Sequence, residues 1–201
     1  MTDSSRSFVA GERAALADLL DELGPDAPTC CAGWTTAHLA AHLVVRDRRL
    51  DAMPGYGWEE MGVGGPLAAW SHRVEDRMRD STPFRELVAR LRSGPPRWSP
   101  MAWPPVARAF NTAEYAIHHE DVRRAQPAWT PRALPREAQD ELWTPATLFA
   151  RRARGGVVLR RSDVAGVEQR IGEGGRVVEG EPMELLLWAA GRRDVARVTV
   201  T

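Results

Sequence analysis

Hydrophobic side chains recur at helical spacing along most of the chain. Apolar residues three and four positions apart predict helical segments over about residues 7–23, 36–50, 70–91, 106–125 and 135–154. Thr82-Pro83 carries a helix-start signal inside the third segment, so that helix is expected to be broken or kinked. Thr144-Pro145 predicts a kink in the last segment. The pattern therefore favours a helical bundle.

The hydrophobic pattern changes from Gly156 onward, where it alternates with a period near two. Short alternating segments separated by glycine turn signals predict strands at VVLRR, GVEQRI and RVVEG. Pro182 then begins a compact apolar helix that ends at Gly191, and residues 195–200 alternate again as a last strand. The expected fold is α+β, mainly α, with a helical bundle over residues 1–154 and a small α+β domain over residues 155–201.

The composition indicates an ordinary soluble globular protein that buries a real core. It is 43% hydrophobic and 27% charged, which is too apolar for a disordered chain and too often charged for a membrane span. The net charge is +0, and all 27 basic residues are arginine. Because nucleic acids and anionic membranes normally attract a basic excess, neither is expected as a partner. The N-terminus lacks the apolar run of a signal peptide, which predicts a cytoplasmic location.

Three residues on two of the predicted helices could bind one metal ion. Glu114 and His118 stand four positions apart, so their side chains project from the same helix face. His42 lies on the inward face of another predicted helix. One carboxylate and two imidazoles form a ligand set for zinc, and also for iron, nickel or manganese, with a position left open. The alternative is that both histidines are ordinary core residues and that Glu114 pairs with an arginine.

Other polar residues near these positions have several interpretations. His38 also stands four positions before His42, but it falls in the first helical turn and ranks lower as a ligand. His119 should face away from His118. Asp121 could orient an imidazole, act as a base, or simply lie at the surface beside an arginine. His72 is most simply a surface or groove residue.

The two cysteines and the loop tryptophans are further candidates. Cys30 and Cys31 are adjacent and cannot close a loop by a disulfide, and no base near Cys31 in sequence marks it as a nucleophile. Trp34 lies in a loop, as do Trp98 and Trp103 in a segment that proline keeps from regular structure. These tryptophans could anchor loops, line the mouth of a site or form a homodimer contact.

Four segments resemble a known family: CAGWTTAHLAAHLVVRDRR, LVARLRSGPPRWSP, FNTAEYAIHHEDVRRAQPAW and GEPMELLLWAAGR. They are similar to the actinobacterial metal-binding branch of the DinB-like superfamily, which includes the mycothiol-dependent maleylpyruvate isomerases. The resemblance implies a DinB-like four-helix bundle whose divalent metal, zinc above all, is held by His42, Glu114 and His118. It also implies that the metal activates the thiol of mycothiol. The absence of lysine is typical of a high-GC genome and agrees with an actinobacterial source.

One position departs from the pattern expected around the second helix. His38 stands where a Thr-x-x-Glu capping box that begins at Thr35 would place an acidic residue, and it could weaken the cap or add a ligand. The leading hypothesis is a mycothiol-dependent isomerase or S-transferase that acts on a small electrophilic substrate. A thiol-independent metal hydrolase with Asp121 as base, and a non-catalytic bundle that binds metal or a small ligand, stay open as alternatives.

Overall fold

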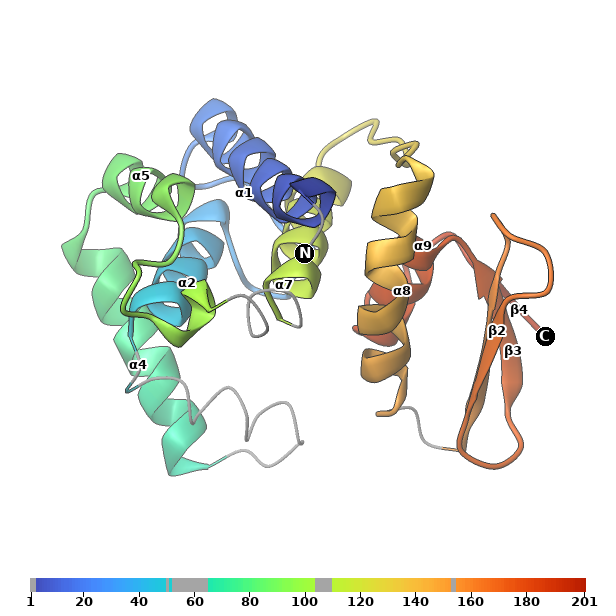
Figure 1. Cartoon of the computed structure of the whole chain (residues 1–201). Helices are drawn as coiled ribbons and strands as arrows, with labels where there is room; N and C mark the ends of the chain where they lie inside the picture. Colours follow the sequence, from blue (N-terminus) through green and yellow to red (C-terminus); the bar gives the residue numbers. More distant parts are fainter. Residues whose placement is uncertain (1–2, 50, 52–64, 104–109, 153–154) are drawn as a thin grey trace.

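The computed structural model describes residues 3–49, 51, 65–103, 110–152 and 155–201 (Figure 1). Within these ranges the helices are α1 (Asp3–Leu23), α2 (Thr36–Arg48), α4 (Pro66–Ser81), α5 (Phe84–Ser93), the 3-10 turn η1 (Pro100–Ala102), α7 (Thr112–Arg124), α8 (Arg136–Ala150) and α9 (Pro182–Ala189). The strands are β1 (Val157–Arg161), β2 (Glu168–Ile171), β3 (Arg176–Gly180) and β4 (Thr199–Val200). The predicted class, α+β and mainly α, is confirmed.

Helices α1, α2, α5 and α7 share one hydrophobic core. Their inward faces contribute large side chains with almost no exposed surface: Leu16, Leu20, Leu39, Leu43, Leu87, Leu91 and Tyr115. Helix α4 covers the outer side of α2, where Val74 packs against Val45. This packing holds α2 between α4 and the rest of the bundle, so side chains of α2 can reach both α4 and α7.

A second core joins α7 to α8, α9 and the sheet. Ala113, Ala116 and Ile117 of α7 belong to this cluster together with apolar side chains of α8, α9 and β1. Figure 1 shows α8 beside α9, between the bundle and the sheet. α7 contributes to both cores, and Phe8 of α1 also packs against the second one, so these two helices join the two parts of the molecule. The boundary after residue 154 stays a prediction.

The four strands form a sheet in the order β2-β1-β3-β4. β1 pairs antiparallel with β2 and parallel with β3, and β4 adds antiparallel to the other side of β3. At the start of the β1–β3 pair, a Cβ on Gly175 would collide with the backbone of Gly156, and both residues have positive φ angles of 103° and 73°. Glycine is therefore required where these two chains pass each other.

The structure confirms most of the predicted elements and shifts some of their ends. The interruption at Thr82-Pro83 is confirmed, because α4 ends at Ser81 and α5 begins at Phe84. The first helix starts at Asp3, earlier than predicted. The fourth begins at Thr112, and the predicted residues 106–109 lie outside the described residues. Helix α8 continues through Pro145.

The prediction of a strand over residues 195–200 was wrong for its first four residues. The backbone N–H groups of Val195 and Ala196 donate to the carbonyl of Arg192, at 3.3 and 3.0 Å. These two N–H groups belong to a turn and so are not free to pair with a neighbouring strand. Only Thr199–Val200 pairs with β3. No helix within the described ranges has the length and apolar character needed to cross a bilayer.

A buried ion pair network fastens α1 to α7 and to the segment that follows it. Glu12 of α1 accepts hydrogen bonds from both Nη atoms of Arg132 at 2.7 and 2.8 Å, and from Nδ1 of His119 at 3.0 Å. Burial alone would raise the pKa of Glu12, but the hydrogen bonds from His119 and Arg132 outweigh it and hold that pKa below its ordinary value. Glu12 is thus a carboxylate in the folded protein.

We expect Glu12→Gln to lower the free energy of unfolding by about 2 kcal/mol near neutral pH, because glutamine keeps the shape but loses the charge. The lowered pKa of Glu12 means that its contribution is complete above the unfolded-state pKa of about 4.5 and disappears as the pH falls through the folded-state value. Urea unfolding of both proteins from pH 7 to pH 3 tests this. A difference that stays constant down to pH 3 would contradict it.

Candidate metal centre

The structure brings together the three residues that the sequence singled out as metal ligands. His42 of α2 and His118 of α7 point their Nε2 atoms at the same carboxylate oxygen, Oε2 of Glu114, at 3.7 and 3.5 Å. The two ring centroids are 5.2 Å apart. One ligand atom from each residue lies within 4.8 Å of those of the other two. Two imidazoles and one carboxylate can therefore reach a common point.

Each of the two imidazoles has a carboxylate partner at its Nδ1 atom. Nδ1 of His42 donates to Oε1 of Glu75, on α4, at 2.7 Å, and Nδ1 of His118 donates to Oδ2 of Asp121 at 2.9 Å. When a ring is neutral and carries its proton on Nδ1 in this way, its Nε2 lone pair is free to bind an ion next to Glu114. Carboxylates that orient histidines by their second nitrogen are typical of metal sites. The donor set and its orientation thus fit a divalent ion such as zinc.

The charges around Glu114 keep it ionised. Burial would raise the pKa of Glu114, but the Arg46 guanidinium, whose Nε lies 3.5 Å from Oε2, and the two imidazoles hold it well below its ordinary value. Burial would lower the pKa of His118, whereas its bonds to Asp121 and Glu114 raise it well above the ordinary value. An ion bound here would therefore have to displace a proton, and its affinity would weaken in acid.

A second group of potential ligands shares His118, and the Arg192 cation already contacts two of its members. Cys31, His118 and Asp121 also bring their ligand atoms within 4.8 Å of one another. The Cys31 thiol donates to Oδ2 of Asp121 at 3.2 Å, and the Arg192 guanidinium contacts both Asp121 oxygens, at 3.0 and 2.9 Å, and the sulfur at 3.4 Å. A metal ion would compete with Arg192 there, which favours the group of His42, Glu114 and His118.

These contacts place Asp121 in the interior. Asp121 is 1% exposed, and the partners of its side chain are His118, Cys31 and Arg192 rather than the neighbouring Arg124. Burial would raise the pKa of Asp121, but the hydrogen bonds from His118 and Arg192 lower it far below its ordinary value. A carboxylate so strongly held in its ionised form is suited to orient an imidazole and poorly suited to accept a proton.

The remaining cysteine and two of the histidines lie outside the cluster. Burial, together with the nearby Asp121 carboxylate, raises the pKa of Cys30 to about 11, so its thiol stays protonated. His38 completes the helix cap, because its Nδ1 accepts the backbone N–H of Thr35 at 3.2 Å, in place of the carboxylate of a capping box. His119 faces away and contacts Glu12.

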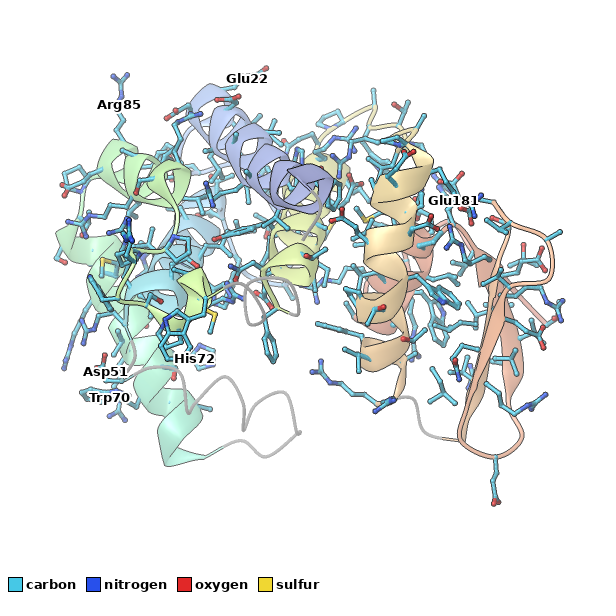
Figure 2. All side chains as sticks on the ribbon, viewed as in Figure 1. Glu22, Asp51, Trp70, His72, Arg85 and Glu181 are labelled. Atoms are coloured by element: carbon cyan, nitrogen blue, oxygen red, sulfur yellow. The ribbon has the colours of Figure 1, made fainter. Side chains whose placement is uncertain are left out.

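A cavity of about 670 Å³ opens beside the cluster. Its lining comes from α2, α4 and α7, from the segments before α2 and α7, and from the ends of α8 and α9. The polar and charged side chains that line it are Cys31, His42, Arg46, His72, Glu75, Glu114, His118, Arg152 and Arg192. Figure 2 labels the half-exposed His72 on α4.

Trp34 also lines the cavity, with its ring centroid 5.2 Å from that of His42. Trp98 and Trp103 are exposed, and neither is among the described lining residues.

Glu75, Arg46 and Arg192 were not found by reasoning from the sequence. Glu75 lies 33 residues from His42, and Arg192 lies 71 residues from Asp121, so no spacing along one helix connects them to the site. Arg192 ends one of the segments that carry the family resemblance, which is the only signal that pointed to it. The packing of α4 on α2 and of the α9 end on α7 brings Glu75 and Arg192 to the site. Arg46 stands four positions after His42 on α2, a spacing that could have found it.

If Glu75 orients His42, Glu75→Ala should weaken zinc binding by about 10- to 100-fold, because His42 then loses the partner that fixes its ring. Glu75→Gln keeps an acceptor oxygen for Nδ1 and should lose less. Competition with a chromophoric chelator measures both affinities. Asp76→Ala, one position along on the exposed face of α4, is the matched control and should bind zinc like the unaltered protein.

Comparison with known proteins gives a clear result only for the fold. No family model matches the chain, and no curated protein matches it. The structure is similar to the crystal structure of the mycothiol-dependent maleylpyruvate isomerase, with a TM-score of 0.59, 19% identity, and coverage of 100% of this chain and 96% of that one. The two proteins share a fold. A histidine-to-alanine mutant of that isomerase gives a TM-score of 0.58 at 18% identity, with 99% and 96% covered.

Proposed function

We propose that this protein is a divalent-metal-dependent isomerase or S-transferase of DinB-like type that uses mycothiol to act on a small electrophilic substrate. The single observation that carries the proposal is the convergence of His42 Nε2 and His118 Nε2 on Glu114, with both Nδ1 atoms held by carboxylates. The fold shared with a mycothiol-dependent isomerase supports the choice of thiol. Zinc as the metal, an actinobacterial source and a cytoplasmic location follow from the sequence resemblance and are parts of this proposal.

The residues of the chain have separate tasks in this proposal. His42, Glu114 and His118 would hold the metal, which lowers the pKa of a bound thiol and so supplies a nucleophile at neutral pH. Glu75 and Asp121 keep the two imidazoles in the tautomer and orientation that binding requires. Three protein ligands leave a position that faces the cavity, where thiol and substrate can meet.

The contacts of Asp121 bear on the choice between thiol transfer and hydrolysis. A thiol-independent hydrolase needs a carboxylate that is free to take a proton from water. Asp121 is held by His118 and Arg192, and its pKa is lowered, so we assign it a positioning role. Access from a cavity of about 670 Å³ is a feature of reactive metal sites rather than of closed structural ones.

The proposal is tested with zinc-loaded protein, mycothiol and a panel of small electrophiles that includes maleylpyruvate. We expect turnover that requires both metal and thiol and that disappears in His42→Ala, while Glu22→Ala, altered on the exposed face of α1, keeps it. Turnover that needs metal but ignores thiol would instead select the hydrolase. No turnover above background with any substrate would refute the proposed activity.

A further inference from the structure

We propose that the apolar side chains that line the cavity next to the proposed metal ligands form a subsite that receives a hydrophobic group of the electrophilic substrate, of phenyl size or similar. This inference deepens the proposed function and rests on it. The lining of the cavity contains two kinds of side chain. All of its histidine and glutamate side chains belong to α2, α4 and α7, and apolar side chains come from α7, α8 and α9, with Arg152 and Arg192 just beyond the ends of α8 and α9.

Helix α7 and the turn before it carry both kinds of side chain. Ile117 follows Glu114 by three positions on the same side of α7, and Phe110 lies in the π-helical turn that leads into the helix. All three line the cavity. Phe110 is 52% exposed, although a large aromatic side chain is normally covered. A hydrophobic ligand bound beside Glu114 would cover this ring and remove its surface from water.

The ends of α8 and α9 complete the apolar wall. Phe149, near the end of α8, lines the cavity, and the Arg152 guanidinium lies 4.5 Å from its ring centroid. The end of α9 contributes the small residues Ala189, Ala190 and Gly191, followed by Arg192, which Asp121 holds. Small side chains at this position fill little of the cavity. The subsite is therefore an apolar part of the lining that includes aromatic rings, next to the point where the proposed reaction occurs.

The size and chemistry of this volume select one class of group. A cavity of about 670 Å³ is within the range that holds drug-sized ligands. Burying a phenyl-sized group against such a wall is expected to strengthen binding by about 10- to 100-fold. Arginines also line the cavity, but Arg46 pairs with Asp47 and Glu114, and Arg192 pairs with Asp121, so carboxylates of the protein offset these two charges. Ile117 and the α9 alanines offer a charged group no hydrogen bond from a side chain.

Hydroxamates, which chelate zinc through a common head group, provide probes that differ only in their tails. Zinc content is measured first, and calorimetry then compares propanohydroxamate, 3-phenylpropanohydroxamate and succinic monohydroxamate on the zinc-loaded protein. We expect the phenyl tail to improve affinity over the plain chain by at least about 10-fold. The carboxylate tail should give no comparable gain.

Variants of the apolar lining residues test whether the phenyl tail gains its affinity at this part of the cavity. Phe149→Ala should reduce the advantage of the phenyl tail to less than about 3-fold, and Ala190→Leu should reduce it by filling the space. Phe110→Ala replaces a half-exposed side chain, so it offers the same test if Phe149→Ala fails to fold. Leu148→Ala is the matched control, since Leu148 is adjacent to Phe149 but 42% exposed and absent from the described lining.

The outcomes separate this inference from the proposed function. A protein that binds neither zinc nor propanohydroxamate would overturn the proposed function and this assignment with it. Equal affinities for the plain and phenyl tails, or tighter binding of the carboxylate tail, would overturn the apolar subsite while leaving the metal site in place. A phenyl advantage that persists in Phe149→Ala, Phe110→Ala and Ala190→Leu would show that the group binds elsewhere and would also overturn it.

Discussion

Replacing Glu114 with alanine should lower the affinity of the protein for zinc by more than about 100-fold. Loss of a residue that only orients a metal ligand lowers metal affinity by about 10- to 100-fold, and Glu114 is itself one of the proposed ligands. Glu114 is the anionic member of the triad, and both imidazoles point at its Oε2. Without it, two neutral nitrogens from α2 and α7 remain beside the Arg46 cation, which repels a divalent ion. Elemental analysis and chelator competition measure the loss.

Variants on α2 and α1 help to interpret the loss of zinc binding expected in Glu114→Ala. His42→Ala should act in the same direction from α2. Glu22→Ala removes an exposed carboxylate near the end of α1 and should leave zinc binding unchanged (Figure 2). Circular dichroism checks that each variant is folded. Unaltered metal content in both Glu114→Ala and His42→Ala would show that these residues are not the ligands.

Removal of Glu184 should lower the free energy of unfolding by about 3 to 5 kcal/mol, the cost of leaving one partner of a buried ion pair behind. Glu184 of α9 accepts two hydrogen bonds from Arg124 of α7, at 2.8 and 2.6 Å, and one from the backbone of Arg197 at 2.8 Å. The Arg124 and Glu184 side chains are 1% and 9% exposed. This pair fastens the C-terminal part of the chain to α7, the helix that carries Glu114 and His118.

Urea unfolding of Glu184→Ala tests this role. Glu179→Ala in β3 is the control, because Glu179 is 44% exposed and lies 3.6 Å from Arg160, so its loss should change stability by less than about 1 kcal/mol. Similar unfolding midpoints for the two variants would contradict the assigned role. We also expect Glu184→Ala to weaken zinc binding less than Glu114→Ala does, since Glu184 contacts Arg124 and Arg197 and none of the proposed metal ligands.

The local parts of this structure could be predicted from the sequence. Spacing along a single helix placed Glu114 and His118 on one face, and threonine followed by apolar residues marked the start of α2. The change of hydrophobic period near residue 156 located the sheet. Each of these signals depends on residues within one element, where periodicity and capping act directly. His42 could be predicted as inward, but its approach to Glu114 depends on the packing of α2 beside α7.

The contacts between elements could not be predicted in the same way. Glu75 reaches His42 because α4 covers α2, and Arg192 reaches Asp121 because the end of α9 docks on α7. Nothing in the spacing of these residues encodes such docking. Cys31 likewise lacked a partner in the sequence and has Asp121 and Arg192 in the fold. The turn that replaces the first half of the last strand is held by a carbonyl of Arg192, which hydrophobic alternation does not reveal.

X-ray absorption at the zinc edge, recorded with and without mycothiol, tests the central claim most directly. If His42, Glu114 and His118 hold the metal and the thiol binds to it, zinc should have only nitrogen and oxygen neighbours before mycothiol is added. One sulfur neighbour at about 2.3 Å should appear afterwards. Sulfur present before addition would indicate the group that contains Cys31, and sulfur absent after addition would contradict activation of the thiol by the metal.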